Sequence, residues 1–355
     1  MKLIIKVGTQ SILSQDGDPF FQLIDHLVAQ LARLQLAGHQ LVLVSSGAVS
    51  SGRKIAREHL ERQYGHSIGE KQTLASLGQV ELMRLFADAF KPYNLLVSQL
   101  LLTKQDFHTR KHYLNIARLF RELLNQQYII PIVNENDSVA IEELMFTDND
   151  ELAGLIAAQL GADKLIILSN VPGVYTDEPG SKDAELISII DPNQSWPEVS
   201  MSKSIHGRGG MFSKLATAKK ISSLGITTHI ACIKEPNVIE RIVNQESLGT
   251  IILPNKRKSN IKRWIAFADR QNASVYINAE LYRLLKDTQQ TRSLLPIGLV
   301  KINGTFKKGD LINICSLTNE RVGVGIARYD STRLNEFIGQ KGKPVFIHYD
   351  QLHIF

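Results

Sequence analysis

Short apolar runs alternate with longer segments of helical periodicity from the N-terminus to Asn255. The short runs predict strands at 3–7, 41–44, 95–102, 128–133, 165–168, 228–232 and 249–252. Apolar residues recur at helical spacing and predict helices at 20–36, 71–90, 110–125, 148–160, 210–224 and 236–244. Gly38 is a stop signal for the first helix, and Asp148 can cap the fourth. The succession predicts an α/β fold with a mainly parallel sheet sandwiched by helices.

The pattern changes after a polar and basic stretch at 254–260. Residues 264–267 are a candidate for one more strand of the first domain. Beyond it, turn signals recur about every ten residues. They separate expected strands at 274–277, 299–302, 311–315, 323–329 and 345–348 and expected short helices at 279–285 and 331–337. We therefore predict a main domain over 1–258, a linker over 259–271 and a small β-barrel-like module over 272–355.

Composition narrows the class of protein. The chain is 43% hydrophobic and 21% charged, which excludes a disordered or collagen-like chain. Cys232 and Cys315 lie far apart without a metal or redox spacing, so we expect reduced thiols in a cytoplasmic protein. Lys6 interrupts the first apolar run too early for a signal peptide, and no stretch approaches the roughly 18 apolar residues of a membrane span.

The basic charge lies in the C-terminal part. Residues 1–255 carry 24 Lys and Arg against 27 Asp and Glu, so 24 − 27 = −3, whereas residues 256–355 carry 17 against 8, so 17 − 8 = +9. Such a tail can contact nucleic acid or an acidic partner, although a solvated surface with a basic linker is the simpler explanation.

Two candidate ligand-binding segments follow predicted strands. Lys6 and Gly8 would place a cation and an accessible backbone at the ligand edge of the sheet, and Ser46 and Gly47 would offer a hydroxyl and amide donors. A surface lysine beside a turn, and a tight turn of small residues, are the simpler alternatives. Neither a G-x-x-x-x-G-K-[ST] loop nor a G-x-G-x-x-G loop is present, so any nucleotide must be held differently.

The densest polar cluster combines 134–137 with 147–150. Seven of these eight residues carry an amide or carboxylate side chain, which suits an ammonium group or a metal ion. The carboxylates would repel one another unless cations lie among them. The alternative is a solvated loop followed by a helix cap.

Two further segments could contact a nucleotide. Residues 207–214 combine glycines, Lys214 and the start of a helix, an arrangement that binds phosphate, although a flexible loop is the alternative. Residues 168–175 follow a strand and could border the base or ribose, but a turn explains them as well.

Together these segments resemble the amino acid kinase family, and within it the kinases that phosphorylate glutamate in the first step of proline biosynthesis. The similarity covers nearly the whole chain, and 134–140 is its most specific part. The C-terminal module resembles a PUA domain, a fold often found in RNA-modifying enzymes. The resemblance implies the amino acid kinase fold and transfer of a phosphoryl group from ATP, with Mg²⁺, to the γ-carboxylate of L-glutamate. It also implies inhibition by proline, a homo-oligomer and possible RNA contact through the C-terminal domain; the metal-binding residues stay unassigned.

The resemblance also assigns roles by motif position. Lys6 and Lys214 would neutralise the transferring phosphoryl group, and Asp150 would hold both lysines. The residues implied to bind glutamate are Ser46, Gly47, Asn134, Asp137 and Asn149. Those implied to line the ATP site are Lys6, Gly8, Ser169, Asn170, Arg208, Gly209, Gly210, Met211, Phe212, Ser213 and Lys214.

Three departures from the family pattern concern the nucleotide rather than the reaction. Asn170 stands where aspartate is usual, Thr147 stands where glycine is usual, and Arg208 with Phe212 makes the phosphate loop bulkier. We expect them to affect ATP affinity.

Three alternatives remain at this stage. The first is a kinase for another small acid, such as aspartate or N-acetylglutamate. The second is an RNA-binding protein that works through its basic C-terminal part, for which Arg328-Tyr329 and His348-Tyr349 offer only thin aromatic support. The third, a nicotinamide-dependent oxidoreductase, lacks its glycine fingerprint.

Overall fold

A computed structural model describes residues 1–14, 16–60, 64–107, 110–139, 148–177, 181, 184–194, 196–197, 210–256, 259, 262–263, 265, 273–286 and 292–355. The chain divides into two compact units, Met1–Arg257 and Lys258–Phe355. Each unit is described by itself below.

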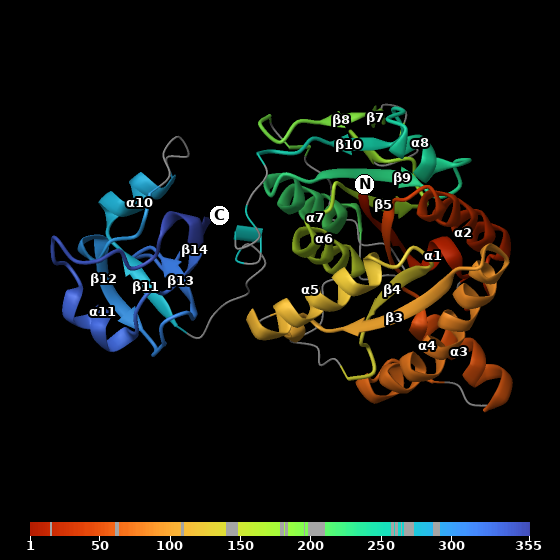
Figure 1. Ribbon diagram of the computed structural model, residues 1–355, viewed down its shortest axis with the longest axis horizontal. Helices are drawn as coiled ribbons and strands as arrows, with labels where there is room; N and C mark the ends of the chain where they lie inside the picture. Colours follow the sequence, from red (N-terminus) through yellow and green to blue (C-terminus); the bar gives the residue numbers. More distant parts are fainter. Residues whose placement is uncertain are drawn as a thin grey trace. The chain divides into compact units, whose positions relative to one another are not determined.

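The first unit alternates strands and helices in the order expected from the sequence (Figure 1). Its strands are β1 (Lys2–Val7), β2 (Gln40–Val44), β3 (Leu96–Leu102), β4 (Ile129–Glu135), β5 (Lys164–Ser169), β6 (Val174–Tyr175), β7 (Leu186–Ile187), β8 (Ile189–Ile190), β9 (Thr227–Cys232) and β10 (Thr250–Ile252). Its helices are α1 (Thr9–Ile12), α2 (Phe21–Leu36), α3 (Ala48–His59), α4 (Ile68–Phe90), α5 (Arg110–Leu124), α6 (Asn149–Leu160), α7 (Met211–Ser223) and α8 (Val238–Val243), with 3-10 turns at Lys91–Tyr93 and Lys104–Phe107.

Eight of these described strands form one sheet in the order β3-β4-β2-β1-β5-β9-β10-β8. The six strands from β3 to β9 are parallel to their neighbours, and β10 is antiparallel to β9. Helices α2, α4 and α8 pack on one face of the sheet, and α5, α6 and α7 pack on the other. The expected α/β fold with a mainly parallel, helix-sandwiched sheet is confirmed.

Parallel strands place their carboxyl ends at one edge of the sheet, and this edge gathers the polar segments. Strands β1, β2, β4 and β5 end at Val7, Val44, Glu135 and Ser169. Helices α6 and α7 each precede a parallel strand, so they run back across the sheet and begin at the same edge. The starts of two helices therefore meet the ends of the central strands.

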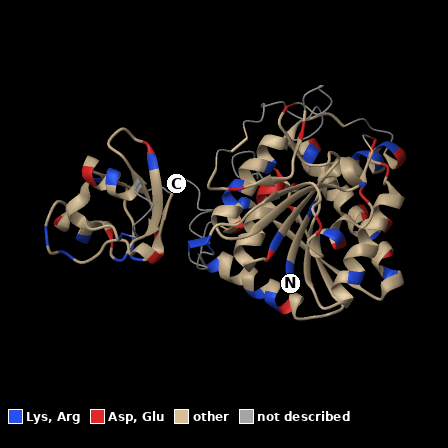
Figure 2. Ribbon diagram, turned by 90° about the horizontal axis from the view of Figure 1, so that it is seen from above, with Lys and Arg blue, Asp and Glu red and all other residues tan. Residues whose placement is uncertain are grey.

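Apolar side chains fill the space between the sheet and its helices. In β1, Leu3, Ile4 and Ile5 are completely buried, and the alternating residues point to opposite faces. Figure 2 shows Lys, Arg, Asp and Glu mainly on the helices and loops around the sheet, while its strands are largely uncharged. Burial on both faces explains the apolar strand sequences.

Helix α3 was missed by the sequence analysis. Its first half contains two serines and Gly52, residues of low helix propensity. Tertiary packing overrides that preference, because a Cβ at Gly52 would clash with the carbonyl of Leu74 in α4, and one at Gly78 would clash with the carbonyl of Ala48. The two helices pack backbone to backbone, which fixes the start of α3 relative to the middle of α4.

The second unit is a small mixed sheet. Its strands are β11 (Ser274–Ile277), β12 (Leu299–Asn303), β13 (Leu311–Cys315), β14 (Arg321–Ile326) and β15 (Leu352–Ile354), in the order β12-β11-β13-β14-β15. Its helices are α10 (Ala279–Lys286) and α11 (Ser331–Phe337), with 3-10 turns at Pro296–Gly298 and Tyr349–Gln351. It has its own apolar core around Val275, Ile312 and Phe346.

One expected strand of this unit is wrong. Residues 345–348 are apolar, but only an isolated bridge joins Ile347 to Leu294, and the last strand is β15. Phe346 is fully buried, with its ring 5.4 Å from that of Tyr329. The apolar run therefore reflects burial in the core rather than a ladder of backbone hydrogen bonds. Of the strand expected at 264–267, only Ile265 lies within the described residues, and it is helical rather than extended.

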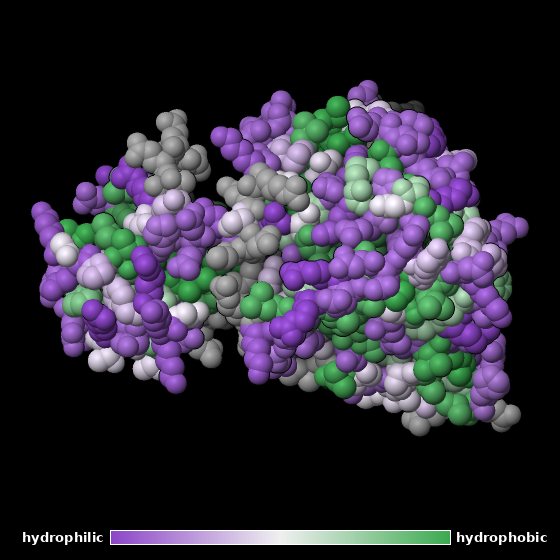
Figure 3. Space-filling view, in the orientation of Figure 1, coloured by the Kyte–Doolittle hydropathy of each residue, from purple (hydrophilic) through white to green (hydrophobic). Residues whose placement is uncertain are grey.

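Hydrophilic and hydrophobic side chains are interspersed on the face of the first unit seen in Figure 3. Among the described residues, no helix is long and apolar enough to cross a membrane.

Candidate active site

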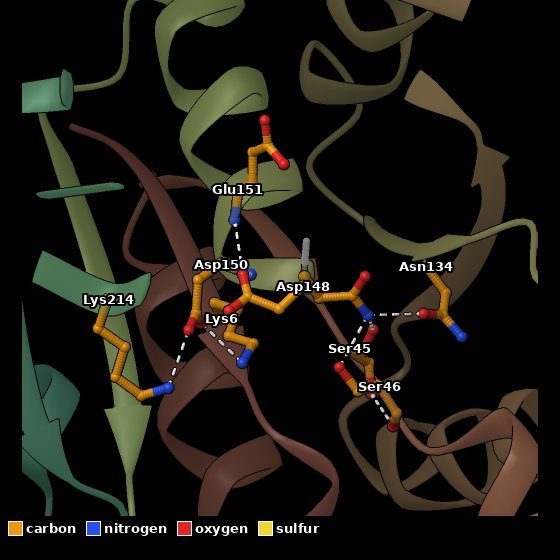
Figure 4. Close-up of polar contacts among 9 residues, drawn as sticks. Lys6, Ser45, Ser46, Asn134, Asp148, Asp150, Glu151 and Lys214 are labelled. Atoms are coloured by element: carbon orange, nitrogen blue, oxygen red, sulfur yellow. Dashed lines mark hydrogen bonds and ion pairs between the residues drawn. The ribbon is translucent and has the colours of Figure 1, made fainter. Parts of the chain in front are cut away.

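An ionic group of three side chains, two of them buried and one partly buried, occupies the carboxyl edge of the sheet (Figure 4). Asp150, in the first turn of α6, lies between Lys6 at the end of β1 and Lys214 at the start of α7. Its Oδ1 lies 2.7 Å from Lys6 Nζ, and its Oδ2 lies 2.8 Å from Lys214 Nζ. Three segments far apart in sequence thus meet at one carboxylate.

Burial makes the balance of charge in this group important. Asp150 is completely buried, which by itself would raise its pKa, but the charges of Lys6 and Lys214 outweigh burial and hold the pKa below its usual value. The group therefore contains two cations and one anion. Its net positive charge is suited to an anionic ligand such as a phosphoryl group.

Asp148 caps the same helix. Its Oδ1 accepts hydrogen bonds from the backbone N–H groups of Asp150 at 2.9 Å and Glu151 at 3.1 Å. The expected N-cap role is confirmed. Burial and the neighbouring charge of Asp150 raise the pKa of the Asp148 carboxyl.

A chain of amide side chains continues from the ionic group to the other side of the site. Asn149 Nδ2 donates to the carbonyl of Ser45 at 2.7 Å, to Ser46 Oγ at 2.7 Å and to Asn134 Oδ1 at 2.8 Å. Asn134 Nδ2 in turn donates to Gln79 Oε1 at 2.9 Å. Asn134 is only 1% exposed, so in this structure it supports Asn149 and Gln79 rather than facing solvent.

Backbone groups fix which way the two asparagine amides face. The Ser45 carbonyl can only accept a hydrogen bond, so the atom of Asn149 beside it must be nitrogen. The Glu135 N–H can only donate, and it lies 2.9 Å from Asn134 Oδ1, so that atom must be oxygen. The oxygen of Asn149 is therefore turned away from Ser45 and Asn134.

A cleft of about 240 Å³ lies beside the amide chain. Its walls come from the start of α3, the middle of α4, strand β3 and the turn after β4. It is lined by Ala48, Ala75, Ser76, Gln79, Val80, Gln99, Leu101, Glu135, Asn136, Asp137 and Ser138. Asp137 thus faces a space for a small ligand.

Gly47 and Gly8 shape the backbone around the ionic group. Gly47 precedes α3 with a φ of 115°, a left-handed conformation that side chains disfavour. A Cβ at Gly8 would lie 3.6 Å from Lys6 Nζ, so the glycine keeps the space beside that ammonium group open.

The expected nucleotide segment after β5 is held by α1. Ser11 Oγ donates to Asn170 Oδ1 at 3.0 Å, and Asn170 Nδ2 donates to the carbonyl of Gln10 at 3.2 Å. Ser169 is the last residue of β5, and its carbonyl accepts the Ile233 N–H. The side chain of Asn170 therefore links the segment after β5 to the turn that follows Lys6.

The other expected phosphate segment opens α7. Gly210 caps this helix without a side-chain hydrogen bond, Ser213 and Lys214 lie in the first turn, and Met211 and Phe212 precede them. Phe212 is 51% exposed. Arg208 and Gly209, like Thr147, lie outside the described residues.

Sequence reasoning missed residues that carry no motif. Gln79 lies in the middle of α4 and Ser11 in α1, and neither position has a local pattern that suggests a ligand. Thr250 of β10 is also buried, and its hydroxyl accepts the Val174 N–H and donates to the Ile187 carbonyl. Contacts between distant segments identify these residues, and no local sequence signal could have done so.

A family model described as the amino acid kinase family matches residues 1–232, most of the first unit and well over half of the chain. The chain belongs to the amino acid kinase family. A second model, the PUA domain, matches residues 274–346. The resemblance of the strand-end motifs to the amino acid kinase family and that of the C-terminal module to a PUA domain are both confirmed.

Curated members of this family are similar over the full length. The chain is 41% identical over 356 residues to "Glutamate 5-kinase" of Chlorobaculum tepidum, covering 99% of this chain and 97% of the relative. It is 36% identical over 358 residues to "Glutamate 5-kinase" of Bacteroides thetaiotaomicron, covering 99% and 98%. It is 37% identical to "Glutamate 5-kinase" of Dictyoglomus thermophilum, covering 97% and 92%.

Solved structures of isopentenyl phosphate kinase share the fold of the first unit. An isopentenyl phosphate kinase aligns with a TM-score of 0.52 at 19% identity, covering 71% of this chain and all of that one. A product complex of the isopentenyl phosphate kinase of T. acidophilum gives a TM-score of 0.50 at 17% identity, with the same 71% coverage of this chain. At these identities the likeness supports the fold alone.

Proposed function

We propose that this chain transfers the γ-phosphoryl group of ATP to the γ-carboxylate of L-glutamate and forms L-glutamate 5-phosphate, the first step of proline biosynthesis. The observation that carries the proposal is the Lys6–Asp150–Lys214 group, connected by the hydrogen-bonded chain from Asn149 through Asn134 to Gln79 with a small cleft. The full-length relatives named glutamate 5-kinase support this choice of acceptor.

The reaction needs little proton transfer. A γ-carboxylate is already ionised at neutral pH, so its oxygen can attack the phosphorus without a general base, and ADP leaves as the P–O bond to it breaks. Lys6 and Lys214 stabilise the charge on the transferring phosphoryl group from two sides, and Asp150 keeps both ammonium groups in position. Catalysis then consists of positioning and electrostatic stabilisation.

The substrates are assigned to opposite sides of the ionic group. Glutamate occupies the side of Ser46, Gly47, Asp137 and Asn149, while ATP occupies the side of Gly8, Ser169, Asn170 and the start of α7. The carbonyl-anchored Asn149 can present its oxygen to the substrate ammonium group, and Asp137 adds a carboxylate.

Mg²⁺ fits this site as a partner of the phosphates. The described residues contain no cluster of three His, Cys, Asp or Glu side chains for a metal ion. Asp150 already pairs with two lysines. Because Mg²⁺ commonly binds phosphate oxygens and water with few protein ligands, we assign it to the ATP phosphates, where it would neutralise their charge.

Trapping of the product tests the function directly. With ATP, Mg²⁺ and hydroxylamine, an acyl phosphate formed from glutamate gives a hydroxamate and inorganic phosphate, and added Fe³⁺ forms a coloured complex with the hydroxamate. Hydroxamate should form with L-glutamate and far less with aspartate or N-acetylglutamate. Efficient reaction with either of the other acids, and not with glutamate, would assign a different acceptor.

Proline is proposed as a competitive inhibitor of the same site. It shares the α-carboxylate and a cationic nitrogen with glutamate but lacks the γ-carboxylate that must reach the phosphoryl group. Rates over a grid of glutamate and proline concentrations at fixed ATP should show inhibition that high glutamate relieves. Inhibition that persists at saturating glutamate would require a separate proline site.

A further inference from the structure

Gln79 stands at the far end of the amide chain from the ionic group. It lies in the middle of α4, is only 8% exposed, and lines the cleft beside Asp137. A long amide side chain in the middle of an amphipathic helix normally faces solvent. Gln79 instead faces inward, where each of its polar atoms requires a partner.

The direction of its amide is fixed through Asn134. The Glu135 N–H requires Asn134 to present oxygen on that side, so Asn134 presents its nitrogen to Gln79. A nitrogen donor requires an oxygen opposite it, and Gln79 Oε1 accepts this bond at 2.9 Å. Gln79 Nε2 is therefore directed away from Asn134.

The two N–H groups of Gln79 Nε2 have no hydrogen-bond partner within the described part of the chain, and the residue borders the cleft. The start of α3 borders the same cleft at Ala48, and no side chain caps this helix. Uncapped N–H groups and the positive end of the helix dipole favour an anion. Two residues that carry such donors, Gln79 and the first residue of α3, therefore border one small space.

The turn after β4, which forms another wall of the cleft, carries negative charge. Glu135 and Asp137 bring carboxylates to the cleft, which favour a cation. A ligand that satisfies both walls carries an anionic and a cationic group next to each other. The α-carboxylate and α-ammonium groups of an amino acid have this arrangement.

We propose that Gln79 Nε2, assisted by the N-terminus of α3, binds the α-carboxylate of the amino-acid substrate. The γ-carboxylate must reach the phosphoryl group at Lys6 and Lys214, and Gln79 lies beyond Asn149 and Asn134 from that group. Because Gln79 lies away from the lysines and offers N–H donors, the α-carboxylate is the substrate group that it can bind. This inference rests on the proposed kinase activity toward glutamate and adds a residue that determines specificity.

The test compares L-glutamate with L-isoglutamine, in which the α-carboxylate is replaced by a neutral amide and the γ-carboxylate is kept. Isoglutamine is measured by kcat/KM, or by its inhibition constant against glutamate if it is not phosphorylated. A hydrogen bond to a charged group predicts that the wild-type protein prefers glutamate about 10- to 100-fold. Gln79→Leu should reduce this preference to within about threefold, mainly through a higher KM for glutamate.

Gln79→Glu separates the two roles of the side chain. A glutamate there can still accept from Asn134 Nδ2, but it replaces the Nε2 donor with a charge that repels a carboxylate. In this variant kcat/KM should fall about tenfold or more for glutamate and less for isoglutamine, while the KM for ATP stays unchanged. Gln99→Glu is the matched control, because Gln99 places the same added charge on another wall of the cleft without a contact to Asn134.

Three outcomes would overturn the inference. Equal losses for glutamate and isoglutamine in the Gln79 variants would show that Gln79 only supports Asn134. A loss of preference in Gln99→Glu as large as in Gln79→Glu would show a general effect of charge. If Gln79→Leu keeps the wild-type preference for glutamate over isoglutamine, Gln79 does not bind the α-carboxylate. Absence of hydroxamate from wild-type protein with glutamate would instead refute the proposed function, so the two failures are distinguishable.

Discussion

The two halves of the candidate site use opposite means to hold their side chains. In the ionic half, Asp150 is fixed by charges, with a lysine ammonium group within 3 Å of each carboxylate oxygen, at 2.7 and 2.8 Å. In the amide half, Asn149, Asn134 and Gln79 are fixed by neutral hydrogen bonds that start from backbone groups. The first half supplies charge, and the second supplies orientation.

The difference has a chemical consequence. A buried carboxylate between two cations leaves net positive charge for a group whose negative charge is being redistributed in the transition state. A neutral amide chain adds no net charge. It can therefore present a chosen oxygen or nitrogen to the substrate's α-ammonium and α-carboxylate groups, which do not react, without disturbing that balance. We therefore expect changes in the ionic half to lower kcat and changes in the other half to raise the KM for glutamate.

The largest effect is expected from the lysines. Lys6→Ala and Lys214→Ala each remove a donor that meets the transferring phosphoryl group, and one such donor is typically worth about 3–4 kcal/mol. We expect kcat to fall about 10²- to 10³-fold in each variant. Steady-state rates with glutamate and ATP both saturating measure this loss.

The proposed division between the two halves of the site is wrong if the lysine variants raise KM values instead of lowering kcat. Circular dichroism and thermal unfolding first establish that each variant is folded, because Asp150 is buried and loses one of its two partners. A folded variant that keeps near wild-type kcat would remove that lysine from the chemistry.

The second prediction concerns the substrate side. Asp137→Ala removes a carboxylate that faces the cleft, where it can pair with the substrate ammonium group. We expect the KM for glutamate to rise about 10- to 100-fold, with the KM for ATP nearly unchanged, because hydrogen bonds between charged groups are worth about 1.5–3 kcal/mol. The same variant should weaken inhibition by proline. Equal changes in both KM values would place Asp137 in the fold or the nucleotide site.

The ionic half was predictable from the sequence, and the reason is topological. Lys6 ends a strand, and Asp150 and Lys214 start helices that each precede a parallel strand. Parallel topology brings all three positions to one edge, and mutual repulsion among carboxylates already required cations nearby. Local pattern and fold rules together determine this part of the site.

The amide half was only partly predictable, because its geometry depends on long-range packing. Gln79 carries no motif, and its inward direction depends on where α4 crosses α3. That crossing requires Gly52 and Gly78, which in the sequence argue against a helix rather than for a close contact. A segment whose local preference conflicts with its tertiary role cannot be assigned from periodicity alone.

A smaller effect is expected from the contact between α1 and the segment after β5, which we assign to the ATP site. Ser11→Ala removes a neutral hydrogen bond to Asn170, worth about 1 kcal/mol, so the KM for ATP should rise about fivefold. Asn170→Asp should have a similar effect, because aspartate cannot donate to the Gln10 carbonyl. The KM for glutamate and kcat should change little in either variant.

The double variant shows whether the pair acts as a unit. If Ser11 and Asn170 position the segment jointly, the double variant should lose less than the sum of the single changes in free energy. Additive losses, or a change confined to the KM for glutamate, would mean that this link does not hold the nucleotide segment.

The smallest effect is expected from removing the second unit. Both halves of the site lie before Ser223, and the first unit has its own core around Leu3, Leu27 and Phe86. A truncated protein ending at Arg257, where the first unit ends, should stay folded and keep kcat and both KM values within about threefold, since the residues assigned to the site and the core beneath them all belong to the first unit. Thermal unfolding and the hydroxamate assay measure fold and activity separately. A truncated protein that is folded but much less active would show that the second unit contributes to the site. A fall in kcat, as expected for the lysine variants, would then implicate the ionic half. A rise in the KM for glutamate, as expected for Asp137→Ala, would implicate the amide half.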